Sequence, residues 1–223
     1  MSLRLRDLVD KTYKEEIALR DAQVQAMQSR INPHFINNAL ETINWQARME
    51  GSETISAMVE SLSVLLNAGM SRNDRRMLSL REELDTARAY FYFIGLRFGN
   101  RLTTHIDVAP EALEDVLPAL TLQPLIENAA EHGVAPAGGG EIRLHCAHAE
   151  GVLKIEVSNS GRPATAEDRQ RIDAALRGDS QSGSHLGLAN ISTRLGLIYS
   201  GRASIRVNTD DPGWTHVYLE IPQ

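Results

Sequence analysis

The chain has one cysteine, few aromatic residues and no long apolar run, and each absence removes a class of protein. A lone cysteine, Cys146, excludes an internal disulfide. No run of 18 or more apolar residues is present, so no segment is expected to span a membrane. The net charge of −6 and pI near 5.7 lack the basic excess of a nucleic-acid binder. With 223 residues, 42% of them hydrophobic and 5% aromatic, we expect a soluble globular chain of one or two domains.

The N-terminal residues are not expected to act as an export signal. The first seven letters, MSLRLRD, are charged and lack the apolar centre of a signal peptide. We therefore expect the chain to be exposed to the cytoplasm. A zinc site is not expected either, because on a strand only Cys146 and His148 would share a side, while His145 would point away.

A histidine directly after a proline is the most informative local feature. Residues 31–40 read INPHFINNAL, and a helix there would place His34 on one face with Arg30, Asn38 and Glu41. The opposite face is apolar and is predicted to be buried; it consists of Ile36, Leu40, Ile43 and Ala47. We therefore predict that His34 faces outward, as a reactive histidine would. These residues alone are equally consistent with a surface histidine beside a Pro33 kink.

Upstream of this histidine the apolar residues follow a coiled-coil spacing. They recur at intervals of seven, three and four, at Ile17, Val24, Met27 and Ile31. Such a seam suits a helix that pairs with a second copy of itself.

A second helix pattern carries metal-binding chemistry. Residues 122–133 read LQPLIENAAEHG, with Asn128 and His132 four apart and Glu127 at the margin of their face. An asparagine oxygen or a carboxylate is a hard ligand of the kind that Mg²⁺ prefers. Taken alone, the segment is better explained as an ordinary amphipathic helix with a polar back.

Two glycine-bearing segments follow. Residues 155–161, IEVSNSG, end a predicted strand, and residues 183–190, GSHLGLAN, lead into a predicted helix. Glycines before a helix N-terminus let backbone N–H groups approach a phosphate closely. Either segment alone could be a plain turn.

The order of these four features resembles the sensor histidine kinases of the LytS/YesM type. Three further segments support the resemblance: residues 80–84 (LREEL), 96–102 (LRFGNRL) and 213–215 (GWT). It spans residues 20 to 223, and the ordered co-occurrence is far more specific than any single motif.

The expected fold class is α+β in three parts. Residues 1–27 form a leading coiled-coil helix, 28–100 the dimerisation and phosphoacceptor region, and 101–223 the ATP-binding domain. Helix is expected from residue 5 to 50, with a break at Gly51-Ser52, and again over 54–70. Such a hairpin cannot cover its own apolar faces, so we expect a homodimer that completes a four-helix bundle.

The later elements alternate between helix and strand. A helix is expected over 80–98. Ser79 is its expected N-cap, and Glu82 and Glu83 lie in its first turn. Strands are predicted over 102–108, 142–148, 152–158, 203–208 and 216–221, and helices over 117–132 and 188–199. This pattern predicts a two-layer α/β sandwich, which the resemblance identifies as the ATPase fold of gyrase, Hsp90, histidine kinases and MutL.

The resemblance also implies an activity, with ATP and Mg²⁺ as cofactors. His34 would take the γ-phosphoryl group of ATP and pass it to an aspartate in the receiver domain of a response regulator. Asn38 would position a water in the reverse, phosphatase reaction. Glu127 would assist the metal or orient water. The parent protein would be a receptor held at the cytoplasmic face of the bacterial cell membrane by a sensor region absent from this chain.

The same resemblance assigns the nucleotide site. Asn128 would ligate Mg²⁺, and His132 would approach the phosphates from the same helix. Asn159 would bind the adenine amino group, and Thr215 would meet adenine from the other side. The pocket would be shaped by Gly161, Gly187, Leu188 and Asn190. Residues 162–182, with a capping start at 165–168 and a stop at Gly178, would form the ATP lid.

Several residues depart from the family pattern. Asn159 stands where Asp is commoner, Pro163 and His185 where glycine is common, and Glu131 where Lys is frequent. We therefore predict weak nucleotide affinity and slow turnover. A rival interpretation is a dimeric relay or scaffold with a degenerate ATP site. The kinase is favoured because a scaffold need not keep His34, Asn128 and residues 187–190 together.

Overall fold

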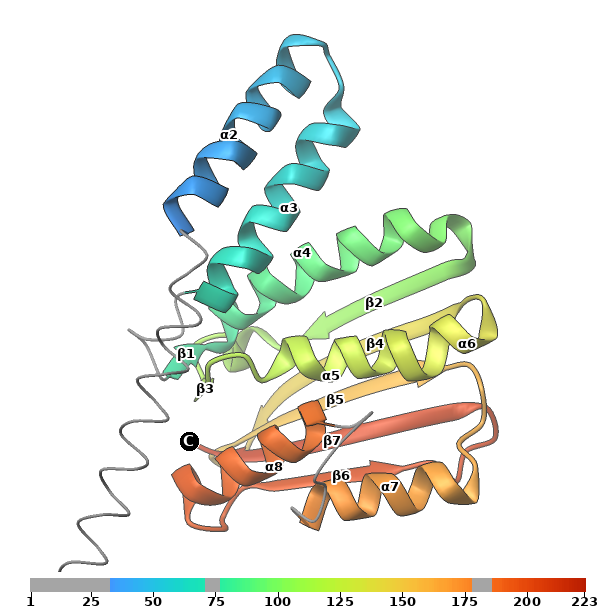
Figure 1. The fold of residues 1–223 in the computed structure, drawn as a ribbon. Helices are drawn as coiled ribbons and strands as arrows, with labels where there is room; N and C mark the ends of the chain where they lie inside the picture. The colour runs from blue at the N-terminus through green and yellow to red at the C-terminus, as the bar shows by residue number, and fades with distance from the viewer. Residues whose placement is uncertain (1–32, 71–76, 178–185) are drawn as a thin grey trace, which may run out of the picture. The chain divides into compact units, whose positions relative to one another are not determined.

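A computed structural model describes residues 33–70, 77–177 and 186–223 (Figure 1). The chain divides into two compact units, Met1–Ser56 and Ala57–Gln223. The predicted coiled-coil seam lies outside the described residues, as do Arg30, Gly178, Gly183 and His185. None of the described helices is long and apolar enough to cross a bilayer.

The first unit contains the helix that carries His34. α2 runs over Pro33–Met49, and α3 follows over Glu53–Met70 after the predicted break at Gly51, which has φ +68°. Pro33 is the first residue of α2, where its missing N–H leaves no helical hydrogen bond unmade. The hydroxyl of Ser56 donates to Oδ1 of Asn44 at 2.5 Å, which ties the start of α3 to α2.

The wheel prediction for α2 is right on the polar face and wrong at one apolar position. His34, Asn38 and Glu41 are exposed. Leu40 and Ala47 are buried, as predicted, and Ile36 is half-buried, but Ile43 is 49% exposed. Ile43 lies about 60° around the wheel from Leu40, at the margin of the stripe, and one neighbouring helix covers only a narrow stripe.

The second unit is built on a five-stranded sheet in the order β2-β4-β5-β7-β6. The strands are β2 (Leu102–Val108), β4 (Gly140–Ala149), β5 (Val152–Ser160), β6 (Ser204–Asn208) and β7 (Trp214–Pro222). β2 and β4 are parallel, and the other neighbours are antiparallel. All five predicted strands are present within two residues at either end, and the β4–β5 and β6–β7 hairpins follow the predicted turns.

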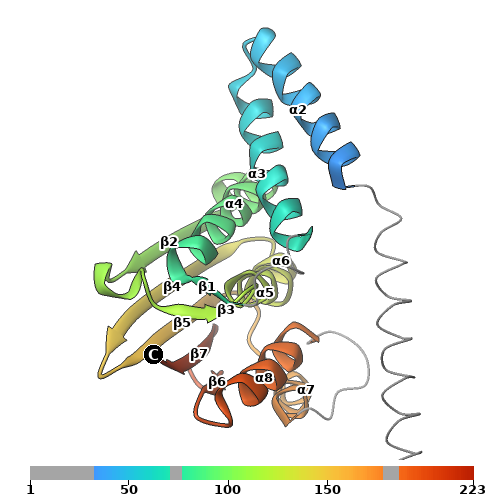
Figure 2. The ribbon, with the colours of Figure 1, turned by 90° about the vertical axis from the view of Figure 1, so that its left-hand side faces the viewer.

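Helices cover one face of this sheet (Figure 2). They are α4 (Leu80–Phe98), α5 (Leu122–Asn128), α7 (Ala166–Arg177) and α8 (Leu186–Tyr199). Leu125 and Ile126 of α5 and Ile191 of α8 are buried in one core with inward residues of the strands, such as Leu144 and Ile155. The predicted α+β, two-layer architecture is confirmed.

The helix predicted over 117–132 begins later than expected. Val116–Pro118 forms a short strand, β3, which pairs antiparallel with β1 (Met77–Ser79). The helix starts only at Leu122, after Leu120 adopts the left-handed conformation with φ +58°. The helix prediction was wrong here because it used only local apolar spacing. The strand depends on pairing with β1, some 40 residues earlier in the chain. The remaining short elements are η2 (Gly99–Arg101), η3 (Pro110–Ala112), the π-helix η4 (Ala129–Val134) and α6 (Ala135–Ala137).

The predicted N-cap of α4 is confirmed. Ser79 Oγ accepts from the backbone N–H of Glu82, and the Glu82 carboxylate accepts in return from the backbone N–H of Ser79 at 2.9 Å. Leu84, Phe91 and Ile94 of α4 share the core of the sheet. α4 therefore packs within the second unit. That it belongs functionally to a dimerisation and phosphoacceptor region of residues 28–100 stays a prediction.

Candidate functional site

A cavity of about 200 Å³ collects most of the predicted nucleotide residues. Asn128, His132, Asn159, Leu188 and Thr215 all line it, although they come from four separate stretches of the chain. Its other lining residues are Leu125, Ala129, Gly133, Arg162, Ala164, Asp168, Arg171, Ile172, Val207 and Val217. Four predicted residues do not line it: Glu127, Gly161, Gly187 and Asn190.

The helix that supplies Asn128 and His132 changes its winding between them. α5 ends at Asn128, and Ala129–Val134 continues as a π-helix. The π-helix is rare, and its single turns within α-helices often coincide with functional sites. No pattern in the sequence indicates this change. Here it puts Asn128, His132 and Gly133 on one cavity wall.

One end of the cavity is built by close contact between two backbone segments. A Cβ on Gly133 would lie 1.8 Å from Nδ2 of Asn159, and a Cβ on Gly161 would lie 2.3 Å from the carbonyl oxygen of Gly133. Gly161 therefore requires glycine, because backbone would have to move, whereas a side chain at Gly133 would displace the Asn159 carboxamide. Gly161 packs against Gly133, which lines the cavity, but does not line it itself.

Asn159 and Thr215 are register partners on β5 and β7 at this end. The Asn159 side chain is buried, with 6% of its surface exposed. Apolar side chains of Leu125, Leu188 and Val217 surround the same hollow. An apolar slot with one buried carboxamide and one hydroxyl suits a flat heterocycle with polar edge atoms.

The other end brings an unsatisfied amide to the start of a helix. Nδ2 of Asn128 is buried and has no hydrogen-bond partner among the residues described. A Cβ on Gly187, in the first turn of α8, would lie 3.1 Å from that atom. A buried polar group without a partner is costly, and a ligand oxygen would satisfy it. Asn190, further along α8, is exposed.

Charged residues line the side of the cavity formed by α7. Asp168 caps this helix: its carboxylate accepts from the backbone N–H of Thr165 at 2.9 Å and from Nη2 of Arg162 at 2.7 Å. The Thr165 N–H and hydroxyl, together with Arg162, hold the pKa of Asp168 below its usual value against a smaller opposing effect of burial. Thr165 and Asp168 thus form the predicted capping start of the lid segment.

The predicted phosphoacceptor belongs to the first unit. His34 is exposed in the first turn of α2, and its Nδ1 lies 3.3 Å from Nδ2 of Asn38, one turn further on. The spacing of four residues places both side chains on one face of the helix.

Family models match most of the chain. The model described as "Histidine kinase" matches residues 22–102, and the model described as "Histidine kinase-, DNA gyrase B-, and HSP90-like ATPase" matches residues 115–223. The chain belongs to the histidine kinase family. The first match contains His34, and the second contains every residue of the cavity.

Named relatives agree with this assignment. The chain is 30% identical to the sensor histidine kinase YesM of Bacillus subtilis over 223 residues, which cover 100% of the chain and 37% of YesM. It is 25% identical to the sensor protein LytS of Enterococcus faecalis over 92% of the chain and 34% of LytS. The resemblance to sensor histidine kinases of the LytS/YesM type is thereby confirmed. The chain spans about a third of the length of these relatives.

Solved structures share the fold. The structure of full-length ShkA in complex with AMPPNP superimposes with a TM-score of 0.50 and 16% identity, over 88% of this chain and 45% of ShkA. At this identity the likeness concerns the fold alone.

The cavity helix is held by a buried carboxylate, a role that the sequence did not reveal. The carboxylate of Glu83, on α4, accepts from the backbone N–H groups of Leu120, Thr121 and Leu122 at 2.5, 2.9 and 2.9 Å. Burial raises the pKa of Glu83, and these N–H groups and Arg194 oppose that shift. The carboxylate thus caps the N-terminus of α5, where the helix dipole also stabilises a negative charge.

Arg194, on α8, completes the clamp from the other side. Its guanidinium donates to the carbonyl oxygens of Ala119 and Leu120 at 2.6 and 3.0 Å. The turn before α5 therefore has its N–H groups bound by α4 and its carbonyl groups bound by α8. The sequence indicates Glu83 only as part of the LREEL segment of the resemblance and of the first turn of α4, whose capping box uses Glu82 instead.

Glu127 does not line the cavity. Its carboxylate accepts from Nε2 of Gln123 at 2.7 Å. Burial, and then the charges of Glu127 and Glu131, raise the pKa of Tyr90 on α4. Both carboxylates are near enough to affect Tyr90, and neither lines the cavity.

The histidines of β4 point to different partners. Nδ1 of His145 lies 2.9 Å from Asp107, whereas Nδ1 of His148 lies 2.7 Å from Asp115. Cys146 between them is buried. Across residues 33–70, 77–177 and 186–223, no three His, Cys, Asp or Glu side chains cluster as metal ligands.

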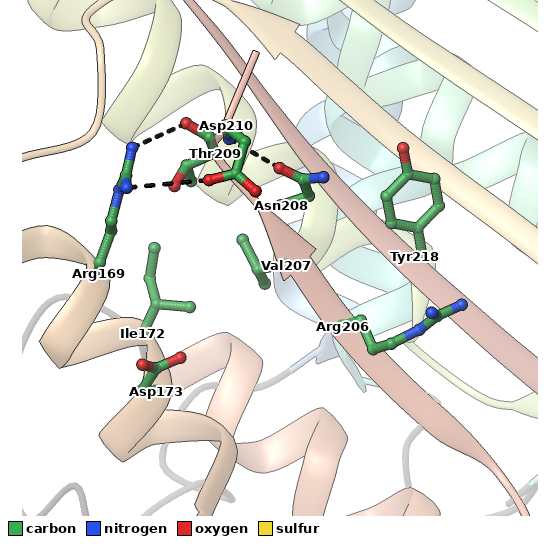
Figure 3. Close-up of a pocket in the computed structure, with 9 residues that line it drawn as sticks. All are labelled: Arg169, Ile172, Asp173, Arg206, Val207, Asn208, Thr209, Asp210 and Tyr218. Atoms are coloured by element: carbon green, nitrogen blue, oxygen red, sulfur yellow. Dashed lines mark hydrogen bonds and ion pairs between the residues drawn. The ribbon is translucent and has the colours of Figure 1, made fainter. Parts of the chain in front are cut away.

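A larger hollow of about 510 Å³ lies between α7 and the end of β6 and contains none of the predicted site residues (Figure 3). Arg169 of α7 donates to the carbonyl oxygen of Thr209 at 3.0 Å and lies 3.9 Å from the carboxylate of Asp210. These contacts tie α7 to the β6–β7 turn. Ile172 and Val207 line both hollows and form their common wall.

Proposed function

We propose that this chain is the catalytic region of a two-component sensor histidine kinase that phosphorylates itself on His34 and then passes the phosphoryl group to a response regulator. The observation that carries the proposal is the convergence of Asn128, His132, Asn159 and Thr215 on one cavity, in a chain that also exposes His34. A relay without ATP chemistry would need no such convergence.

The cavity suggests how ATP would lie. The purine fits the apolar end at Asn159 and Thr215, and the triphosphate fits the end with the buried Asn128 amide and the first turn of α8. Asn128 also fits Mg²⁺, since its carboxamide offers a hard oxygen at the phosphate end. When bound, Mg²⁺ would neutralise charge on the phosphates.

The transfer follows from ordinary phosphoryl chemistry. A ring nitrogen of His34 attacks the γ-phosphorus with its lone pair, the bond from that phosphorus to the β–γ bridging oxygen breaks, and ADP leaves. The imidazole loses its proton to solvent. In the second step a carboxylate of the regulator takes the phosphoryl group, and the histidine is regenerated.

Dimerisation is part of the proposal. Several large apolar side chains of the hairpin are exposed in the single chain: Phe35, Ile43, Trp45, Met49 and Ile55. A second copy would cover them in a four-helix bundle. Because the chain spans about a third of YesM and LytS, a longer, membrane-anchored parent at the cytoplasmic face is proposed with it.

The direct test is to incubate the chain with γ-³²P-labelled ATP and Mg²⁺ beside the His34→Gln variant. The proposal expects acid-labile label on the natural chain alone. Label on both proteins would show that the phosphoacceptor is a residue other than His34. Absence of label despite measurable ATP binding would favour the relay or scaffold. Asn159, an amide where the family more often has a carboxylate, leads us to expect weak affinity, and a low-micromolar dissociation constant by calorimetry would contradict that part.

A further inference from the structure

We propose that the nucleotide pocket accepts 6-oxopurine nucleoside triphosphates, such as ITP, about as well as ATP, because Asn159 is the residue that reads the edge of the base. This inference rests on the proposed nucleotide site and adds its base specificity.

The position of Asn159 makes it the base-reading group. Its side chain is 6% exposed and lines the apolar end of the cavity. Its register partner Thr215 contributes a hydroxyl, which can either donate or accept. The side chains around them, Leu125, Leu188 and Val217, contact a base without discriminating between polar edge atoms.

The carboxamide is only loosely held in its present orientation. Among the described residues it makes one hydrogen bond, from Nδ2 to the carbonyl oxygen of Ser160 at 3.4 Å, near the limit for such a bond. Gly133 faces it without a side chain. Half a turn about the Cβ–Cγ bond exchanges oxygen and nitrogen, two atoms of nearly equal size.

This exchange matches the difference between the two kinds of purine. Adenine presents an N6–H donor beside an N1 acceptor, so the amide oxygen accepts from N6–H and Nδ2 donates to N1. Hypoxanthine presents an O6 acceptor beside an N1–H donor, so the turned amide donates to O6 and accepts from N1–H. Both bases then make two hydrogen bonds with Asn159, and binding does not distinguish them strongly.

A carboxylate at this position would behave differently. It only accepts hydrogen bonds, so it pairs with the adenine N6–H but places its lone pairs against the O6 lone pairs of hypoxanthine. The Asn159→Asp variant keeps the shape of the side chain and removes the donor. It should bind ATP and reject ITP, by the same logic that makes a polar site reject a mismatched analogue.

The experiment is isothermal titration calorimetry of the full 223-residue chain with ATP and with ITP, each with Mg²⁺. The natural chain should bind the two with dissociation constants within about tenfold, and Asn159→Asp should widen the ratio to about a hundredfold or more in favour of ATP. Thermal melts by circular dichroism establish that the variant is folded. Asn159→Ala removes both donor and acceptor and should weaken both ligands while leaving their ratio close to one.

The outcomes separate the inference from the proposed function. If the natural chain binds ATP but rejects ITP as strongly as Asn159→Asp does, the base-reading role is overturned and the nucleotide site stands. Unchanged affinities in Asn159→Ala would also overturn it. If ATP binds to none of the three chains, the nucleotide site and the inference fall together.

Discussion

The side-chain amide of Asn38 lies 3.3 Å from Nδ1 of His34, one helical turn earlier on α2. Both side chains are exposed, so a partner protein can reach them together. The contact holds the amide beside the ring nitrogen, where the proposed phosphatase role would need it to position a water. The neighbouring residue, Phe35, offers no acid or base for that purpose.

Replacement of Asn38 by Ala should therefore slow dephosphorylation of the response regulator by tenfold or more, within the range expected for one positioned catalytic group. Label should still reach His34 from ATP, because the acceptor ring remains. The measurement follows loss of ³²P from a purified, phosphorylated regulator. Unchanged loss with Asn38→Ala would refute the positioning role, and Thr42→Ala on the same helix serves as a control.

The buried carboxylate of Glu83 should be needed for stability. In Glu83→Gln, one end of the side chain presents N–H donors to the backbone N–H groups of residues 120–122, so donors face donors. We expect a loss of about 2–4 kcal/mol in the free energy of unfolding, in the range for breaking the hydrogen bonds of a buried carboxylate. Asp85→Asn, at an exposed position of the same helix, should change it by less than about 0.5 kcal/mol. Urea denaturation followed by circular dichroism measures both, and equal midpoints would contradict the clamp.

Much of the fold followed from local patterns. The alternation of apolar residues located the five strands of the sheet, and Ser79 and Thr165 marked the starts of α4 and α7. The break at Gly51 was visible because glycine tolerates the left-handed backbone found there. In each case neighbouring residues alone determine the structure.

The features that the sequence did not reveal depend on residues far apart in the chain. β3 forms because it pairs with β1, and the turn before α5 is fixed by Glu83 and Arg194 from two other helices. The π-helix after Asn128 has no spacing signal of its own. The cavity was predictable only through the family resemblance, because nothing local to Asn159 indicates that His132 lies across from it.

The contact between Gly161 and Gly133 should make Gly161→Ala strongly destabilising. The added Cβ would lie 2.3 Å from the carbonyl oxygen of Gly133, and φ at Gly161 is +149°, so backbone must move. We expect a loss of at least about 2 kcal/mol and no detectable ATP binding. Gly95→Ala is the matched control, because its Cβ meets nothing within 4 Å and lies in the interior of α4. That variant should be as stable as the natural chain or more stable by about 0.5–1 kcal/mol, and a similar loss in both variants would contradict the argument.

The thiol of Cys146 should be unreactive in the folded chain. Burial first, and the charge of Asp107 second, raise its pKa from 9.0 to about 12. At pH 8 a thiol reagent should therefore label the protein only in denaturant. Because the folded pKa is the higher one, the stability contributed by this group is present below pH 9 and is lost as the pH rises toward 12. Rapid labelling at pH 8 without denaturant would show that Cys146 is accessible; Cys146→Ala gives the background.

The unsatisfied amide of Asn128 predicts opposite effects on stability and on binding. Asn128→Ala removes a buried Nδ2 that has no partner within the described part of the chain, so the melting temperature without nucleotide should stay the same or rise. The same variant loses the group proposed to meet the phosphates and Mg²⁺. Addition of saturating ATP and Mg²⁺ should raise the melting temperature of the natural chain, by linkage between binding and folding, but not that of Asn128→Ala. Asn208→Ala, in the larger hollow beside α7, should keep the full ATP-induced shift. If the shift survives in Asn128→Ala and disappears in Asn208→Ala, the nucleotide binds in that hollow and the assignment of the smaller cavity is wrong.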